Sequence, residues 1–394
     1  MSSFSREIAI TGPAAGGEGV GRDADGRATF VGGALPGERV SVDLTEEHDR
    51  WARGQLTEVL VASDDRIAPP CPEVARGCGG CDYQHASLDL QRTMKLDVVR
   101  DALVRIGKVS DPPDIVMTAL PSTAYRSAVR LGVEHGRAAY RRLRSHDLVA
   151  VDSCLVAHPL VDEIITEGRF PAATEVAIRV GVNTGERIVV VEPTAADVSV
   201  PDDVIVIGLN QMRKGRKAHI HEEIAGTVFR VSAGSFFQSR PDGAEALVHL
   251  VAAAAGDDTV GQMVDLCAGV GLFAATVDAD HVEAVEANRS AARDARHNLG
   301  DIPSRVHGFG VGDWRPCDAD FVVADPPRDG LGQGGVDKVV ATGAPVVALV
   351  SCDAGSLGRD AGLLSGAGYS LTAVDVVDMF PQTHHVEVVS VFTR

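Results

Sequence analysis

Long apolar runs, lysine and aromatic residues are all scarce in this chain of 394 residues. No stretch comes near the run of about 20 apolar residues that a membrane helix needs, so we expect no membrane span. The first residues, MSSFSREIAITG, lack the ordered basic, apolar and cleavage regions of a secretory signal, which predicts a cytoplasmic protein. A hydrophobic content of 45% excludes disorder over the whole chain.

Basic residues are also fewer than acidic ones, 37 against 55. A net charge of −18 excludes a protein that coats nucleic acid without specificity, but it does not exclude a specific nucleic-acid enzyme. Only five of the 37 basic residues are lysines. Arginine suits planar contacts with phosphates and bases, although a GC-rich coding sequence explains the bias equally well.

The basic residues gather in two islands. Residues 124–146 hold six arginines and one acid, and residues 211–217 hold four basic residues and no acid. Two such islands in an acidic chain indicate a surface that faces a polyanion, and a solvated face is an equally good interpretation. The islands consist of Arg126, Arg130, Arg137, Arg141, Arg142 and Arg144, and of Arg213, Lys214, Arg216 and Lys217.

The chain length predicts two or three domains. Residues 1–66 hold short β-rich runs between turn clusters such as residues 12–26, a pattern that usually closes into a five-stranded barrel. Residues 67–235 look mixed, apart from a helix predicted over 87–107 that could pack on the last domain. Across residues 236–394 strands and helices alternate, which predicts an α/β fold with a doubly wound, Rossmann-like parallel sheet.

A nucleotide-binding pattern follows the first strand of the last domain. In Asp265-Leu-Cys-Ala-Gly-Val-Gly-Leu-Phe273 a strand ends in an acid, and a Gly-x-Gly turn is predicted to open a helix with free N–H groups. Glu286 ends the next strand about 20 residues further on, where a carboxylate can accept from ribose hydroxyls. Tight strand–helix packing is the alternative. An acid before such a turn is typical of S-adenosylmethionine (SAM) methyltransferases, by analogy of fold.

Three further segments lie at the ends of strands in the same predicted sheet. Asp325-Pro-Pro-Arg-Asp-Gly330 is either a rigid loop above the ligand crevice or an ordinary turn. Cys352 follows an apolar strand and is either a small core residue or a nucleophile. Glu387 opens the last strand and is either a solvated edge charge or a base beside that cysteine.

Together these segments resemble the SAM-dependent RNA (uracil-5-)methyltransferases, and the resemblance covers essentially the whole chain. Asp325–Gly330 and Ser351–Asp353 match the family pattern Asp-Pro-Pro-Arg-x-Gly, a gap, then Ser-Cys-Asp. Residues 378–387 match Asp-x-Phe-Pro-Gln-Thr-x-His-Val-Glu at every fixed position, and Phe236-Phe-Gln238 matches the Phe-Phe-Gln that opens the catalytic domain. The departures are Leu349, Ser356, Cys267 and Leu272, which replace a tyrosine, a threonine, an aromatic residue and an asparagine.

The resemblance implies a covalent mechanism. The Cys352 thiolate would add to C6 of uracil, C5 would take the methyl group of SAM, and Glu387 would remove the C5 proton. The base must leave its stack, so a looped or flipped-out RNA is implied. The cofactor residues expected are Gln238, Asp265, Cys267, Gly269, Gly271, Leu272, Glu286, Asp313 and Asp325. The thiols of Cys267 and Cys317 are interpreted as packing groups.

Residues 6–62 resemble the TRAM domain, an RNA-binding barrel, through GEGVGR, ATFVGGALPGERV and DRWARGQLTEVLVASDDR. Downstream, Cys71, Cys78 and Cys81 are spaced C-x6-C-x2-C, and Cys154 follows at a distance. A cytoplasmic location disfavours disulfides, and spacing alone leaves zinc and an iron–sulfur cluster comparable. Family members with a TRAM barrel bind a [4Fe–4S] cluster through four such cysteines, so the resemblance implies that cluster here, in an iron–sulfur central domain.

The resemblance also implies a monomer that forms 5-methyluridine in 23S ribosomal RNA. The T-loop of transfer RNA is the alternative substrate, because some relatives act there. An inactive RNA-binding or chaperone protein would have lost the nucleophile or the base, and both are present. An electron-transfer enzyme would need a further cofactor site or a C-x3-C-x2-C triplet, which the sequence lacks.

Overall fold

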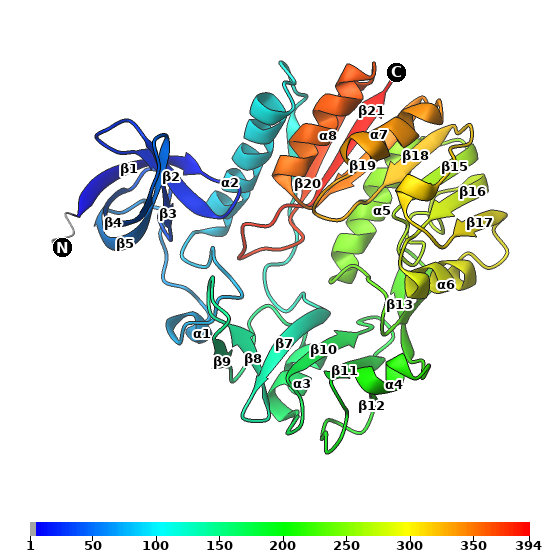
Figure 1. Cartoon of the computed structure of the whole chain (residues 1–394), viewed down its shortest axis with the longest axis horizontal. Helices are drawn as coiled ribbons and strands as arrows, with labels where there is room; N and C mark the ends of the chain where they lie inside the picture. The colour runs from blue at the N-terminus through cyan, green and yellow to red at the C-terminus, as the bar shows by residue number, and fades with distance from the viewer. Residues whose placement is uncertain (1–4) are drawn as a thin grey trace.

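A computed structural model describes residues 5–394 and has three parts (Figure 1). A β-barrel comes first in the chain, a mixed sheet follows, and a large α/β sheet ends it. The loop between the last two strands, drawn in red, reaches toward the centre of the molecule (Figure 1). Within residues 5–394 no helix combines the length and apolar character needed to cross a membrane.

The N-terminal part is a closed five-stranded barrel with strand order β1-β2-β3-β5-β4, as the sequence predicts. Strand β2 lies inside residues 12–26, so the interpretation of that whole stretch as a turn cluster is wrong. A Cβ on Gly19 would lie 2.6 Å from the Ala34 carbonyl oxygen, and one on Gly21 would lie 2.2 Å from that of Ala9. These glycines therefore mark close backbone packing in a strand. The strands are β1 (Arg6–Pro13), β2 (Glu18–Arg22), β3 (Ala28–Gly32), β4 (Arg39–Glu47) and β5 (Trp51–Val61).

The middle part is a six-stranded sheet in the order β12-β11-β10-β7-β8-β9, followed by the hairpin β13-β14. Strand β10 alternates buried and half-buried residues, and its buried side packs with apolar residues of α3 in one core. The elements are α1 (Pro72–Ala75), β7 (Ala128–Glu134), β8 (Arg137–Arg141), β9 (Leu148–Ala150), α3 (Pro159–Glu167), β10 (Glu175–Val180), β11 (Arg187–Glu192), β12 (Val204–Gly208), α4 (Leu209–Arg213), β13 (His219–Ile224) and β14 (Thr227–Ser232).

The C-terminal sheet has eight strands in the order β17-β16-β15-β18-β19-β21-β20-β6. It is parallel from β17 to β19, whereas β21 runs antiparallel to both its neighbours, so the prediction of a parallel sheet holds for only part of it. The elements are α5 (Pro241–Ala255), β15 (Val260–Leu266), β16 (Ala279–Val285), α6 (Arg289–Asn298), β17 (Ser304–His307), the 3-10 turn η2 (Val311–Asp313), β18 (Phe321–Ala324), α7 (Gly332–Ala341), β19 (Val346–Ser351), α8 (Ala354–Gly366), β20 (Ser370–Val377) and β21 (Val388–Thr393).

Both faces of this sheet are covered, which confirms the doubly wound arrangement. Met263 and Phe321 belong to a core with α5 and α6, whereas their neighbours Val264 and Val322 belong to a second core with α7 and α8. Successive strand residues point to opposite faces, so the two cores lie on the two sides of the sheet.

Three elements of the C-terminal part come from inside residues 67–235. The predicted helix 87–107 is α2 (Leu88–Asp101) and a π-helical turn, η1 (Ala102–Ile106), and both contribute to the core beneath α7 and α8. Strand β6 (Ile115–Thr118) pairs in parallel with β20 at the sheet edge. Their apolar side chains complete the last sheet, although they precede the proposed boundary at residue 236.

Candidate active site

Several candidate residues meet at one edge of the C-terminal sheet because its strands end in register. Leu266, the last residue of β15, pairs with Val285 on one side and with Ala324 on the other. Glu286 and Asp325 are the residues that follow those two partners. The structure therefore brings the Gly-rich segment and both acids to the same edge of the sheet.

Cys352 and Glu387 reach this edge from neighbouring antiparallel strands. Ser351 at the end of β19 pairs with Val388 at the start of β21, so Cys352 leaves the sheet where Glu387 enters it. The Glu387 side chain is buried, and that of Cys352 is half-buried in a small pocket that Arg328 also lines. A thiol and a carboxyl group thus lie together within the fold.

Burial and the neighbouring negative charges oppose ionisation of the Cys352 thiol and of the carboxyl groups at this edge. Burial, and then the carboxylates of Glu387 and Asp325, raise the pKa of Cys352 to about 11, while Arg328 acts in the opposite direction. Burial, and then Asp325, raise the pKa of Glu387 well above its ordinary value. Burial likewise raises the pKa of Asp325. Without a ligand, the thiol therefore holds its proton at neutral pH, and burial disfavours the ionised form of Glu387.

Asp265 sits wholly buried at the end of β15. Its Oδ2 accepts a hydrogen bond from the Ala274 amide at 3.0 Å, and its Oδ1 is buried without a partner among residues 5–394. Burial, and with it the carboxylates of Asp325 and Glu286, raise the pKa of Asp265 to about 8. An unpartnered acceptor at a ligand edge favours a donor from a bound molecule.

Residues 267–278 form a run of turns, so the helix predicted after the Gly-x-Gly turn is not present. Cys267, Gly269 and Gly271 all have left-handed φ values, of +63°, +58° and +91°. Between Gly271 and strand β16 the Ala275 amide donates to the Gly271 carbonyl oxygen and the Val277 amide to that of Phe273, each at 3.0 Å, so only irregular helical turns form there. The Gly269 amide donates to Glu286 Oε2 at 2.8 Å. Leu272, which belongs to this loop, is buried.

Gln238 joins the candidate set, and Asp313 does not. The buried Gln238 amide donates to Asp325 Oδ2 at 3.3 Å, which links the Phe-Phe-Gln segment to the Asp-Pro-Pro loop. Asp313 is exposed at the end of η2. Within residues 5–394 no hydrogen bond or ion pair connects Asp313 with another candidate.

The loop before Glu387 is held by helix residues that the sequence analysis missed. Lys95 Nζ donates to Asp378 Oδ1 at 2.8 Å and to the Phe380 carbonyl oxygen at 2.9 Å. Gln91 accepts from the Gln382 amide at 2.8 Å and donates to the Gln382 side chain at 3.1 Å. Both helix residues are buried. Their presence on the apolar side of the predicted helix was the sequence signal that could have indicated buried hydrogen-bond partners.

A second contact joins this loop to the cysteine segment. Asp82, which follows Cys81, accepts from the His384 amide at 3.1 Å, and its other oxygen lies 2.5 Å from His384 Nδ1. The Tyr83 amide donates to the Gln382 carbonyl oxygen at 2.9 Å. The loop that carries Glu387 therefore rests directly on the segment that follows Cys81.

The four predicted metal ligands line one small pocket: Cys71, Cys78, Cys81 and Cys154. The Tyr140 hydroxyl donates to Cys154 Sγ at 3.1 Å. Burial raises the pKa of Cys81 to about 12. Within residues 5–394 no group of three or more histidine, cysteine or acidic side chains has the arrangement of a metal-ion site. The four thiols line one pocket, but they do not converge on the position of a single metal ion.

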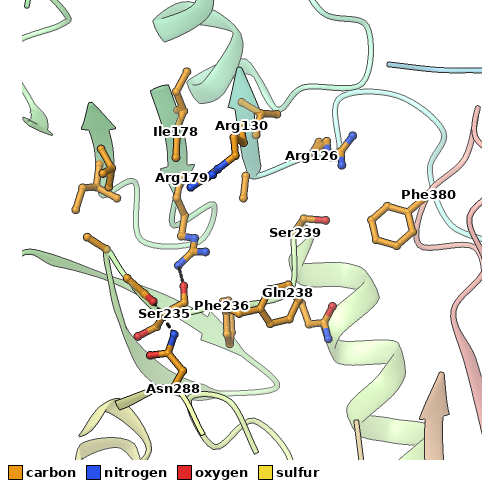
Figure 2. Close-up of a pocket in the computed structure, with 18 residues that line it drawn as sticks. Arg126, Arg130, Ile178, Arg179, Ser235, Phe236, Gln238, Ser239, Asn288 and Phe380 are labelled. Atoms are coloured by element: carbon orange, nitrogen blue, oxygen red, sulfur yellow. Dashed lines mark hydrogen bonds between the residues drawn. The ribbon is translucent and has the colours of Figure 1, made fainter. Parts of the chain in front are cut away.

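A cavity of about 540 Å³ separates the central sheet from the segment 235–239 (Figure 2). Arg126, Arg130 and Arg179 enter it from the central part of the chain, and the Phe380 ring closes one end (Figure 2). Phe236 is 66% exposed in its wall. Gln238 also lines the cavity, which therefore adjoins the candidate active site.

Comparisons with known proteins agree with this architecture. Residues 5–57 match the TRAM domain model. The chain is 33% identical to an uncharacterized RNA methyltransferase of Streptomyces avermitilis, over 98% of this chain and 97% of that protein. It is 31% identical to one of Corynebacterium glutamicum, over 98% and 96%. Its fold is similar to that of the Pyrococcus abyssi tRNA (uracil-54, C5)-methyltransferase in complex with S-adenosyl-L-homocysteine, with a TM-score of 0.76 at 20% identity over 98% of this chain and 100% of that one.

A doubly wound sheet with a Gly-rich turn and acids at its carboxyl edge defines a nucleotide-binding α/β enzyme. The chain belongs to the RNA methyltransferases that begin with a TRAM domain.

Proposed function

We propose that the protein transfers a methyl group from SAM to C5 of a specific uridine in RNA, with Cys352 as nucleophile and Glu387 as base. The observation that carries the proposal is the register of β19 and β21. It sets a thiol beside a buried carboxyl group at the sheet edge that holds the Gly-rich loop. C5 of uracil is a poor nucleophile, and this pair supplies the two groups that its activation needs.

Each group has one task. The Cys352 thiol gives up its proton to solvent and its sulfur bonds to C6, which moves the C5–C6 π electrons into an enolate across C5 and O4. SAM supplies the methyl group that C5 takes. The Glu387 carboxylate then accepts the C5 proton, the C6–S bond breaks, and the C5–C6 double bond re-forms as the thiolate leaves. The raised pKa of Glu387 makes its ionised form a stronger base for that proton.

The sheet edge suits a cationic ligand such as SAM, which carries a sulfonium and an ammonium group. Asp265, Glu286 and Asp325 supply three carboxyl groups there, and in the described part of the chain Asp265 Oδ1 has no hydrogen-bond partner. A cation or an N–H donor would offset that negative charge. The residues that would hold SAM are Gln238, Asp265, Cys267, Gly269, Gly271, Leu272, Glu286 and Asp325, with the exposed Asp313 proposed for the adenine.

We propose a [4Fe–4S] cluster at Cys71, Cys78, Cys81 and Cys154. The donor set supports the proposal, because four thiols line one pocket and thiolate is the ligand that such clusters use. A cluster of four irons is larger than one ion, so its ligands need not converge on a single point. The contact of Asp82 with His384 gives the cluster segment a structural task beside the active site.

We propose 23S ribosomal RNA as the substrate, since the combination of a TRAM barrel with four cysteines resembles ribosomal-RNA enzymes. Transfer RNA is the second candidate, favoured by the fold shared with the archaeal tRNA enzyme. Mapping 5-methyluridine in both RNAs from a deletion strain decides between them. We further propose that the enzyme works as a cytoplasmic monomer.

Replacement of Cys352 by alanine tests the reaction. Purified Cys352→Ala should transfer no methyl group from labelled SAM to the RNA identified by the mapping, and should bind that RNA almost as tightly as the wild type. Cys317→Ala, which removes a thiol away from the sheet edge, is the control and should retain activity. Turnover by Cys352→Ala at the wild-type rate would end the assignment.

A further inference from the structure

A second hollow, of about 250 Å³, lies between the cysteine segment and the turn that follows β8. The Gly79 amide donates to the Arg141 carbonyl oxygen at 2.9 Å, and Cys78 forms a β-bridge with Arg142. A Cβ on Gly79 would lie 2.2 Å from the Leu143 amide nitrogen, so only glycine permits this approach. The segment that carries two candidate cluster ligands therefore supports the turn directly.

Arginine dominates the lining of this hollow, which we call the arginine groove. Five of the six arginines of the first basic island line it: Arg126, Arg130, Arg141, Arg142 and Arg144. Within residues 5–394, Arg130 pairs with Glu175 and Arg144 pairs with Glu18, each at 2.9 Å. The other three have no carboxylate within 4.0 Å in that part of the chain.

Of these three arginines, Arg126 also lines the cavity beside the candidate active site. Its Nε is buried and has no hydrogen-bond partner within residues 5–394. Its guanidinium lies 6.0 Å from the centre of the Phe380 ring, in the loop that leads to Glu387. Arg126 also lines the pocket of the four cysteines, so this N–H faces two sources of an anionic acceptor, the thiolates proposed there and a ligand in the groove.

The arginine groove is continuous with the cavity beside the active site. Arg126 and Arg130 line the arginine groove and also the cavity drawn in Figure 2. Gln238, at the other side of the cavity, donates to Asp325. The arginine groove therefore joins the cavity that Gln238 lines, and Gln238 contacts the sheet edge through Asp325.

We propose that the arginine groove binds the phosphate backbone of single-stranded RNA beside the target uridine. This inference rests on the proposed function and adds where the flanking nucleotides lie. A base that leaves its stack needs unpaired or distorted neighbours, and these present phosphates at regular intervals. Guanidinium groups bind such phosphates without reading sequence. In a chain with a net charge of −18, a local cluster of arginines offsets the overall repulsion of a polyanion.

Salt-dependent binding tests the groove. A fluorescent 12-nucleotide oligouridine is titrated with the full-length, anaerobically purified protein at several KCl concentrations, and affinity is followed by anisotropy. Each phosphate contact to a single strand contributes about 0.7 to the slope of log affinity against log salt. The double variant Arg130→Gln/Arg141→Gln should therefore lower the slope by about 1.4 and raise the KM for RNA.

The matched control is Arg293→Gln/Arg305→Gln, which removes two exposed arginines from α6 and β17. It should leave the slope and the methylation rate unchanged. An unaltered slope in Arg130→Gln/Arg141→Gln, or an equal loss in the control, would overturn the proposal. Formation of 5-methyluridine by the same preparations tests the proposed function separately. A lowered slope without methylation would remove only the proposed function.

Discussion

The Lys95 ammonium donates to the Asp378 carboxylate at 2.8 Å, although 283 residues separate the two in the chain. Their side chains are 1% and 3% exposed. Arg92 also donates to Asp378, at 3.1 Å. This buried ion pair fixes the first residue of the loop that ends in Glu387 to helix α2, so the position of that loop depends on a helix from much earlier in the sequence.

Removal of the Asp378 carboxylate should destabilise the fold. Asp378→Ala leaves a buried lysine uncompensated, and breaking such a pair costs about 3–5 kcal/mol. The measurement is the free energy of unfolding in urea. Asp89→Ala, on the exposed side of the same helix, is the control and should leave the unfolding midpoint in place. A variant Lys95→Met/Asp378→Leu should recover much of the loss. An unchanged midpoint in Asp378→Ala would contradict the role given to the pair.

The reactivity of Cys352 should depend on pH, and the dependence should reveal the effect of the charged neighbours on its pKa. Its pKa is raised to about 11, so alkylation of the ligand-free protein by iodoacetamide should speed up steadily between pH 7 and pH 10. Glu387 raises that pKa and Arg328 lowers it. At pH 9, Glu387→Gln should therefore be alkylated faster than the wild type, and Arg328→Gln more slowly. Peptide mass spectrometry separates Cys352 from the other thiols, and equal rates in all three proteins would refute the arrangement.

Glu387→Gln should trap a covalent RNA adduct that already carries the methyl group. Glutamine has nearly the same shape as glutamate but cannot accept the C5 proton, so methyl transfer proceeds while release of Cys352 stalls. Radiolabelled SAM and a denaturing gel reveal the adduct. Glu387→Gln/Cys352→Ala is the control and should show none. Normal turnover, or a trapped adduct without label, would assign the base to another residue.

The anaerobically purified protein should be brown and contain about four irons per chain if the four cysteines bind a [4Fe–4S] cluster. Serine at Cys71, Cys78, Cys81 or Cys154 should lower the iron content and the visible absorbance, whereas serine at Cys317 should not. Tightly bound zinc without visible absorbance would instead identify a structural zinc site.

The sequence by itself determined the barrel and the doubly wound sheet, and it singled out Cys352 and Glu387 as candidate catalytic residues. Alternating apolar residues fix which face of a strand is buried, and strand ends with acids and glycines mark the ligand edge of a sheet. The Asp-Pro-Pro-Arg, Ser-Cys-Asp and Phe-Pro-Gln-Thr segments carried the remaining information, because each is local in the chain. The sequence analysis missed the barrel strand Glu18–Arg22, because its glycines are needed for close contacts with backbones that are distant in sequence.

Only the tertiary structure decided how distant segments meet. The register of Ser351 with Val388 sets the thiol beside the carboxyl group, and no local pattern specifies a strand register. Residues 267–278 form turns where a helix was expected. Lys95 and Gln91 hold the loop that leads to Glu387. A buried polar group needs a hydrogen-bond partner, and here the partners come from a distant part of the chain. A sequence lists those partners, and only the folded chain brings them within hydrogen-bonding distance.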